Sequence, residues 1–227
     1  MNKLTLELIK QLPKVELHCH LDGSLRVDTI IDLAKKNNID LPTIDKNKLS
    51  KLISLKSQNI SLEKYIALFD ITLSVMQNKN SLERISYELM EDLSNDNVVY
   101  AEIRFSPILH TKNNLTIDDA LRSVKTGLEK GSKKFGIKYG IIICGIRSID
   151  PSVSIKLAEL AVDYKNNGVV GFDLAGAEYN YPAKKHKEAF YIIRNNNINT
   201  TIHAGEAFGP ESIHQAIHTC GANRIGH

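Results

Sequence analysis

The sequence predicts an α/β protein built on parallel strands. Short runs of β-branched and aromatic residues alternate with longer segments of helical periodicity along the 227 residues, a pattern typical of strands joined by crossover helices. Polar residues at the ends of three of these runs favour a barrel, because parallel strands bring their carboxyl ends to one mouth. No linker or internal repeat marks a boundary, so we expect one domain over residues 1–227.

Six strands are predicted in order along the chain. They cover residues 14–21, 98–106, 138–147, 169–176, 199–206 and 224–227. Between them, apolar residues spaced three and four apart predict amphipathic helices over residues 61–75, 117–135, 154–168 and 182–196. The first connection, residues 27–97, holds two or three helical patterns, and we expect a helical insertion that covers one end of the sheet. Its Asn- and Lys-rich part, residues 35–60, is expected to be exposed.

Composition excludes several classes of function. The net charge is +3, and the densest basic run, residues 184–187, contains no aromatic residue, so nucleic acid is not expected as a partner. No run of about 18 apolar residues is present to cross a membrane. Cys19, Cys144 and Cys220 lie far apart without a CxxC pair, which argues against disulfides and thiolate zinc sites and favours a cytoplasmic protein.

The first predicted strand carries an unusual number of polar side chains. Successive side chains of a strand alternate between its two faces. The polar face carries Glu16, His18, His20 and Asp22, and the other face carries Val15, Leu17, Cys19 and Leu21. We expect the apolar face to pack against helices and the polar face to point into a barrel, where the two imidazoles can reach one metal ion.

Two further strand ends supply the rest of a candidate metal site. His203 lies in the fifth strand with Glu206 three residues later, and His227 ends the sixth. Four histidines and a carboxylate at three strand ends favour a shared site over isolated structural histidines. Neutral imidazoles are good zinc ligands, and a catalytic zinc lowers the pKa of a bound water toward about 7. Glu206 is then placed to donate a proton to a substrate.

Five motifs, in this order and spacing, resemble those of adenosine deaminases in the metal-dependent amidohydrolase superfamily. They are LPKVELHCHLDGSLR, VVYAEIRFSP, GFDLAGAE, TIHAGE and RIGH, and together they cover essentially the whole chain. The resemblance implies a (β/α)8 TIM barrel with one zinc ion per chain at its mouth. It also implies hydrolytic deamination of adenosine and 2′-deoxyadenosine, with release of ammonia, in purine salvage.

The resemblance implies a role for each residue of the metal site. His18, His20 and His203 are the zinc ligands. Glu206 is the acid that protonates the purine nitrogen next to the attacked carbon, and His227 orients and polarises the zinc-bound water.

Substrate contacts are also implied by the resemblance. His20 lies against the substrate, Asp22 contacts the ribose 5′-hydroxyl, and the backbone of Gly176 meets the purine. Tyr65 and Phe69 match an aromatic lid, although their spacing is equally typical of core packing in an amphipathic helix. The expected partner is a small purine nucleoside, and the full-length protein is expected to be a monomer.

The chain departs from the family pattern at two places. Ala177 stands where an acidic residue usually follows DLAG, and the Asp-Asp pair that supplies a further zinc ligand and a purine contact has no counterpart in these residues. Six strands also cannot close an eight-stranded barrel. We therefore expect a barrel truncated after about the sixth strand, with the edge of the first strand exposed, that aggregates and is inactive by itself.

Several alternatives remain open from the sequence. Within the enzyme class they are adenine deaminase and AMP deaminase. Asp22 argues against AMP, because a carboxylate repels a 5′-phosphate, whereas adenine deaminases tend to carry Glu at that position. Outside the enzyme class, the chain is a non-catalytic fragment that binds zinc.

The remaining histidines are expected to be structural. His110, His186, His214 and His218 are predicted to lie in loops or on helix surfaces. His214 and His218 are spaced like a metal-binding pair on a helix, but this spacing alone is a weak indication, and no metal site is expected there.

Overall fold

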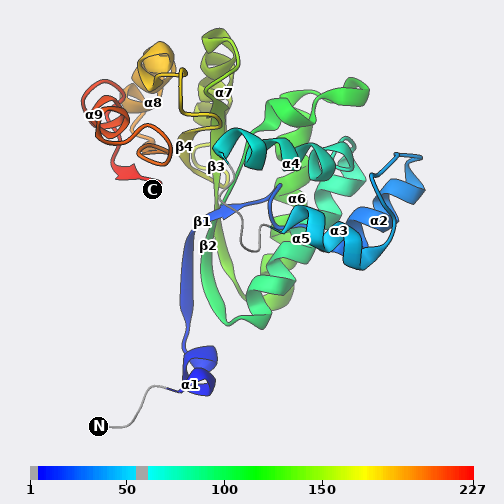
Figure 1. Ribbon diagram of the computed structural model, residues 1–227. Helices are drawn as coiled ribbons and strands as arrows, with labels where there is room; N and C mark the ends of the chain where they lie inside the picture. Colours follow the sequence, from blue (N-terminus) through cyan, green and yellow to red (C-terminus); the bar gives the residue numbers. More distant parts are fainter. Residues whose placement is uncertain (1–4, 55–60) are drawn as a thin grey trace.

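Six parallel strands form one sheet whose order follows the chain, β1-β2-β3-β4-β5-β6. The computed structural model describes residues 5–54 and 61–227. The strands are β1 (Lys14–His20), β2 (Val98–Phe105), β3 (Lys138–Ile146), β4 (Val169–Ala175), β5 (Asn199–Ile202) and β6 (Arg224–Ile225). They curve into a half-barrel (Figure 1), so the predicted α/β fold and all six predicted strands are confirmed.

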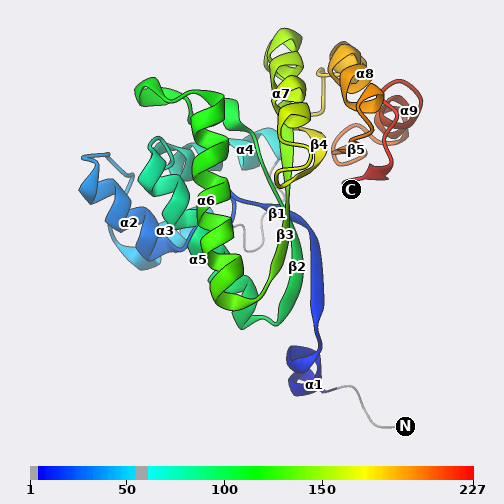
Figure 2. The same ribbon diagram turned by 180° about the vertical axis from the view of Figure 1, so that it is seen from behind.

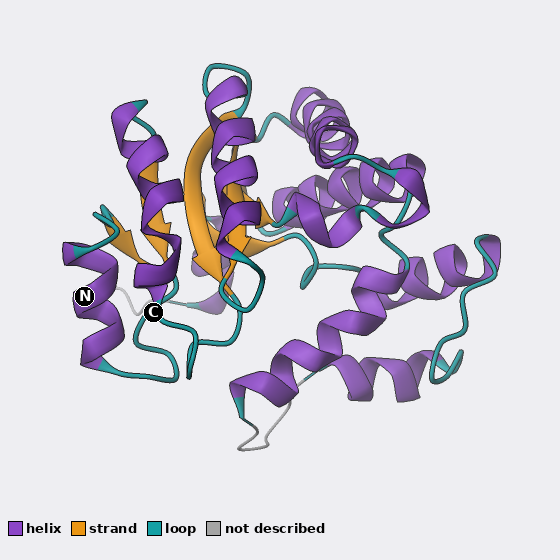
Figure 3. Cartoon of the chain, turned by 90° about the horizontal axis from the view of Figure 1, so that it is seen from above, coloured by secondary structure: helices purple, strands orange, loops and turns teal. Residues whose placement is uncertain are grey.

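Helices lie between successive strands and gather around the curved sheet (Figure 3). The α-helices are α1 (Leu6–Gln11), α2 (Val27–Lys36), α3 (Lys46–Ile53), α4 (Leu62–Ser74), α5 (Lys79–Asn95), α6 (Ile117–Phe135), α7 (Pro151–Asp163), α8 (Lys187–Asn195) and α9 (Pro210–His218). Short 3-10 turns are η1 (Pro107–His110), η2 (Lys112–Asn114) and η3 (Ala183–His186). No helix in the described ranges is long and apolar enough to cross a membrane.

Helix α6 has the bounds that its sequence predicts. The Thr116 side chain accepts a hydrogen bond from the backbone N–H of Asp119, whose carboxylate accepts one from the backbone N–H of Thr116. This reciprocal capping satisfies two amide groups that the first helical turn leaves without partners. Helix α6 packs side by side with α5 (Figure 2).

The described part of the connection between β1 and β2 holds four helices, α2 to α5, where the sequence suggested two or three. Helix α4 lies near the carboxyl end of β1, as expected for an insertion that covers one end of the sheet, and α1 lies at the opposite end (Figure 1). Residues 35–60 were predicted to be exposed. Most of residues 35–54 are exposed or partly exposed, but Leu49 of α3 is fully buried. Residues 55–60 of that stretch lie outside the described residues.

The two faces of the sheet differ in chemistry because of the strand register. Ile103 of β2 is aligned with Ile141 of β3, and Ile143 with Phe172 of β4. These four side chains are fully buried in the hydrophobic core. The alternate positions point to the other, inner face, where His20 is aligned with Arg104, and Cys144 with Asp173. The inner face therefore carries the polar residues.

The outer face of β1 is less covered than the sequence predicted. Leu21 is fully buried, but Val15 is 57% exposed and Leu17 is 39% exposed. Both side chains are therefore largely in contact with solvent. The expectation that the apolar face of this strand packs against helices is wrong for its first half.

Candidate metal and active site

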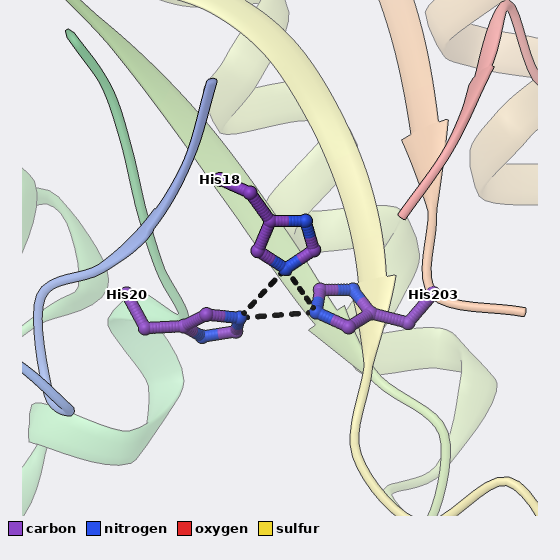
Figure 4. A group of neighbouring side chains, drawn as sticks. All are labelled: His18, His20 and His203. Atoms are coloured by element: carbon purple, nitrogen blue, oxygen red, sulfur yellow. Dashed lines mark hydrogen bonds between the residues drawn. The ribbon is translucent and has the colours of Figure 1, made fainter. Parts of the chain in front are cut away.

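Three histidine rings converge at the carboxyl ends of β1 and β5 (Figure 4). Alternation along β1 places His18 and His20 on its inner face, and His203 follows the last residue of β5. The Nε2 atom of His18 lies 3.2 Å from that of His20 and 3.0 Å from that of His203, and the last two are 3.0 Å apart. The structure thus brings together all three residues predicted as metal ligands.

This arrangement fits a tetrahedral zinc ion. Zn–N bonds of about 2.0–2.1 Å in tetrahedral geometry separate ligand nitrogens by about 3.3 Å, close to the separations seen here. Burial lowers the pKa of His18 and of His20 to about 3, so both rings are neutral near pH 7 and offer a lone pair. Three imidazole ligands leave a fourth position open to water or substrate.

A buried carboxylate behind the histidines orients one of them. Asp173 of β4 is fully buried and accepts a hydrogen bond from Nδ1–H of His203 at 3.1 Å and one from Arg104 at 2.7 Å. Burial alone would raise the pKa of Asp173, but His203 and Arg104 hold it well below its usual range. With Nδ1 carrying the proton, Nε2 of His203 is the free ligand atom.

Neither Asp173 nor Arg104 was a candidate site residue from the sequence. Both lie within the strand motifs GFDLAG and VVYAEIRFS, and alternation alone would have placed them on the polar face. The partner of each could not be read from the sequence, because the two residues are 69 positions apart.

Glu206 and His227 lie beside the histidine cluster. His227 has its ring centroid 5.0 Å from that of His18 and 5.2 Å from that of His203, and its Nε2 is 3.8 Å from a carboxylate oxygen of Glu206. The side chains of His227 and Glu206 are 40% and 33% exposed, so both can reach a bound molecule. Neither belongs to the set of three ligand nitrogens.

Asp22 and Gly176 also face the site. Asp22 is 8% exposed, its Oδ1 has no hydrogen-bond partner among the described residues, and burial raises its pKa to about 6. Gly176 follows β4 with a φ of +97°, a backbone conformation that favours glycine.

A cavity of about 390 Å³ extends from the histidines toward α4. The apolar part of its wall is made by Leu62, Ile66, Leu73, Leu109, Ile146 and Ile149. Tyr65 and Phe69 line the same cavity, with ring centroids 5.3 Å apart in an edge-to-face contact. The spacing of Tyr65 and Phe69 was equally typical of core packing and of a lid over the site. In the structure both rings line the cavity.

The remaining histidines differ from the sequence prediction in two cases. His110 is fully buried with Nδ1 3.2 Å from the carbonyl oxygen of Met76, and His186 is 2% exposed with Nδ1 2.8 Å from Ser154 Oγ. We expected these two histidines in loops or on helix surfaces. This expectation is wrong, because both side chains are buried in the core. His214 and His218 are exposed on α9 as predicted.

Comparison with known families matches residues 13–227 to the family model described as adenosine deaminase. The chain belongs to the adenosine deaminase family. A Dictyostelium discoideum relative named "Probable adenosine deaminase" is 47% identical over 226 residues, covering 99% of this chain. The adenosine deaminase of Mycobacterium ulcerans is 45% identical, covering 98% of this chain. The chain spans 29% and 63% of the lengths of these two relatives.

Solved structures of other proteins share the fold of this adenosine deaminase family member. An amidohydrolase from Burkholderia ambifaria with bound Zn matches with a TM-score of 0.85 at 24% identity, covering 98% of this chain and 61% of that one. The N6-mAMP deaminase of Arabidopsis matches with a TM-score of 0.83 at 28% identity, covering 98% of this chain and 67% of that one. These matches agree with a (β/α)8 barrel of which the six strands form part.

Proposed function

We propose that the protein containing these residues is a zinc-dependent deaminase of adenosine and 2′-deoxyadenosine. The observation that carries the proposal is the convergence of His18, His20 and His203 beside Glu206 at the mouth of a largely apolar cavity. Imidazole ligands with one open position are typical of a catalytic zinc. The adenosine deaminase relatives and the Zn-bound amidohydrolase support the same assignment.

Each polar side chain has a proposed part in the chemistry. His18, His20 and His203 would hold the zinc ion, which when bound supplies Lewis-acid activation of water near neutral pH. His227, 3.8 Å from the Glu206 carboxylate, would orient the attacking water. Glu206 would donate its proton to the purine nitrogen beside the attacked carbon, which makes that carbon more electrophilic.

The cavity supports a purine nucleoside as substrate. Tyr65 and Phe69 would cover the base against the apolar wall and exclude water from it. The backbone of Gly176, which carries no side chain, leaves room for the purine edge. His20 and Asp22 would contact the substrate, with Oδ1 of Asp22, which has no hydrogen-bond partner among the described residues, accepting a hydrogen bond from the ribose 5′-hydroxyl.

Charge around the cavity favours a nucleoside over a nucleotide. The described lining residues include three carboxylates, Asp22, Asp70 and Glu206, and no Lys or Arg. A 5′-phosphate would bring up to two negative charges near these groups, and no Lys or Arg side chain among the described lining residues offsets them. AMP and N6-methyl-AMP are therefore disfavoured, although one neighbour acts on N6-mAMP.

The proposed setting is purine salvage in the cytoplasm. Inosine and ammonia would be the products from adenosine, and all three cysteines of the chain are free thiols, as is usual in a reducing compartment. The full-length protein is proposed to be a monomer.

The test is a comparison of substrates with the full-length, zinc-loaded protein. Deamination of adenosine, 2′-deoxyadenosine, adenine and AMP is followed by ultraviolet absorbance, before and after zinc is removed with a chelator. We expect kcat/KM for adenosine to exceed that for AMP by at least about 100-fold, and activity to disappear without zinc and return when zinc is restored.

Other outcomes would identify the alternatives. A preference for adenine or AMP would replace the substrate assignment, and full activity in metal-free protein would contradict the zinc assignment. Stoichiometric zinc binding without turnover of any of the four compounds would favour a non-catalytic zinc protein.

A further inference from the structure

The loop that carries Glu206 is held by one buried carboxylate. Glu178, three residues after β4, is 4% exposed. Its oxygens accept hydrogen bonds from the backbone N–H groups of Gly205 at 2.7 Å, Phe208 at 3.0 Å and Ala207. Two of these amides belong to the residues on either side of Glu206. The carboxylate therefore fixes the peptide units that set the direction of that side chain.

The shape of this loop depends on such support. Gly205 has a φ of +95°, and a Cβ there would come within 2.8 Å of Ile213, so the backbone turns where most residues would not. Burial alone would raise the pKa of Glu178, but hydrogen bonds from Ser212 and from the backbone amides together lower it. The group is then ionised, and hydrogen bonds to a charged acceptor are about twice as strong as neutral ones.

The loops after β4 and β5 are also joined by Arg147. Its guanidinium is 2% exposed and donates to the carbonyl oxygen of His203 at 2.6 Å and to that of Tyr181 at 2.8 Å. On the outside, the rings of Tyr179 and Phe208 lie edge to face with centroids 5.8 Å apart. The two loops therefore form one hydrogen-bonded unit behind the site.

We infer that Glu178 is a positioning residue for Glu206, acting through the backbone of residues 205–208. Glu178 does not line the cavity, so it acts on the reaction only by fixing where the acid lies. This inference rests on the proposed function, because it assigns a role in the proton transfer that Glu206 would perform. A misplacement of about 1 Å is enough to cost about 100-fold in rate.

The test is a double-mutant cycle between Glu178 and Glu206 in the full-length, zinc-loaded protein. Glu178→Gln keeps the shape but turns one acceptor into an NH2 group that cannot accept the amide hydrogen bonds. We expect kcat for adenosine to fall by about 10- to 100-fold with KM changed by less than about threefold. In a Glu206→Gln background the same change is expected to lower kcat by less than about threefold, since the acid that it positions is gone.

A second readout does not depend on turnover. Hydrogen exchange followed by mass spectrometry on peptides covering residues 203–209 is expected to be at least about 10-fold faster in Glu178→Gln, because the NH2 group leaves one or two of the three amides without an acceptor. Zinc content is expected to stay at one per chain. Glu159→Gln, an exposed carboxylate on α7, is the matched control and is expected to change neither kcat nor exchange.

Two results would overturn the inference in an active enzyme. One is an equal loss of kcat in both backgrounds, which is the behaviour of a general structural defect. The other is unchanged exchange over residues 203–209. If Glu178→Gln does not fold, Glu178→Asp, which keeps the charge on a shorter side chain, goes through the same cycle with the same expected coupling. Lack of adenosine turnover by the unmutated protein would instead overturn the proposed function.

Discussion

Asp173 links the metal ligands to the interior of the sheet. It accepts hydrogen bonds from His203 and from Arg104, and all three side chains are buried. A carboxylate in this position sets which nitrogen of the imidazole carries the proton and raises the basicity of the other. The residue therefore serves both the candidate metal site and the fold.

The substitution Asp173→Asn tests both roles of this carboxylate, in zinc binding and in the stability of the fold. We expect zinc affinity to fall by about 10- to 100-fold, because the amide orients His203 less well. The free energy of unfolding is expected to fall by about 3–5 kcal/mol, because the buried Arg104 loses its charged partner. Zinc titration against a competing chelator and chemical denaturation measure the two effects. Asp163→Asn on the exposed end of α7 is the control, and equal zinc affinity in both variants would refute the role of Asp173.

Glu206 gives a second prediction at this scale. Glu206→Gln cannot donate the proton but leaves the three ligand nitrogens in place, so we expect kcat to fall by at least about 100-fold with zinc content unchanged. Steady-state kinetics on adenosine measure kcat, and metal analysis of the same sample measures the zinc content. Near-normal kcat would remove Glu206 from the proposed mechanism.

Helix α4 is the element that closes the cavity from above the histidines. Phe69→Ala removes half of the aromatic pair, and we expect KM for adenosine to rise by about 3- to 10-fold, corresponding to the roughly 0.5–1.5 kcal/mol of an aromatic contact. Little change in kcat is expected, because Phe69 is an apolar group with no proton to transfer. Tyr191→Ala, on the exposed face of α8, is the control. An unchanged KM would assign the ring to packing alone.

The 3-10 turn η1 places His110 in the core, where burial disfavours the charged imidazole. Burial lowers its pKa to about 4, against an ordinary value of 6.5. Below pH 6.5 the unfolded chain binds a proton at His110 and the folded chain does not, so the free energy of unfolding falls as the pH is lowered toward 4. The shift predicts a loss of about 3 kcal/mol over this window.

The measurement for His110 is a comparison of chemical denaturation at pH 7.5, 6.5, 5.5 and 4.5 for the unmutated protein and His110→Gln. The glutamine is expected to be less stable at pH 7.5 but to lose less stability on acidification. His214→Gln on the exposed surface of α9 is the control and should retain the full pH dependence. Parallel curves for all three proteins would contradict this account of His110.

At the scale of the whole molecule, the half-barrel leaves apolar surface open on one side. Among the described residues the outer edge of β1 pairs with no strand. Val15 and Leu17 are exposed on its outer face, as are Leu6 and Leu12 at α1, at 70% and 46%. An exposed edge with apolar side chains is a site for pairing with another chain.

Residues 1–227 expressed alone are therefore expected to self-associate and to show no adenosine turnover above background, even with added zinc. The edge strand that carries His18 and His20 pairs on one side only among the described residues, and we expect this to leave the metal site poorly supported. Light scattering after size-exclusion chromatography measures the association, and the paired change Val15→Lys with Leu17→Lys is expected to reduce it. A soluble, active monomer of residues 1–227 would contradict this prediction.

Local sequence patterns were enough to predict most of the elements. The alternation in β1 and the apolar spacing of α6 depend on neighbours within a few residues, and both elements were predicted with nearly the observed bounds. The number of helices before β2 was underestimated because α3 is short and buries only Leu49, so its apolar periodicity is weak.

The sequence by itself determined the strands, their parallel order and the histidines that meet at their ends, because strand alternation and the direction of parallel strands decide which residues share one mouth. Only the tertiary structure decided which polar groups pair behind the site. Asp173 meets Arg104 through strand register, and Glu178 meets the amides of residues 205–208 through the approach of two loops. Each of these contacts joins residues at least 27 positions apart, and no local pattern specifies such a pair because its geometry is set by packing of the whole sheet.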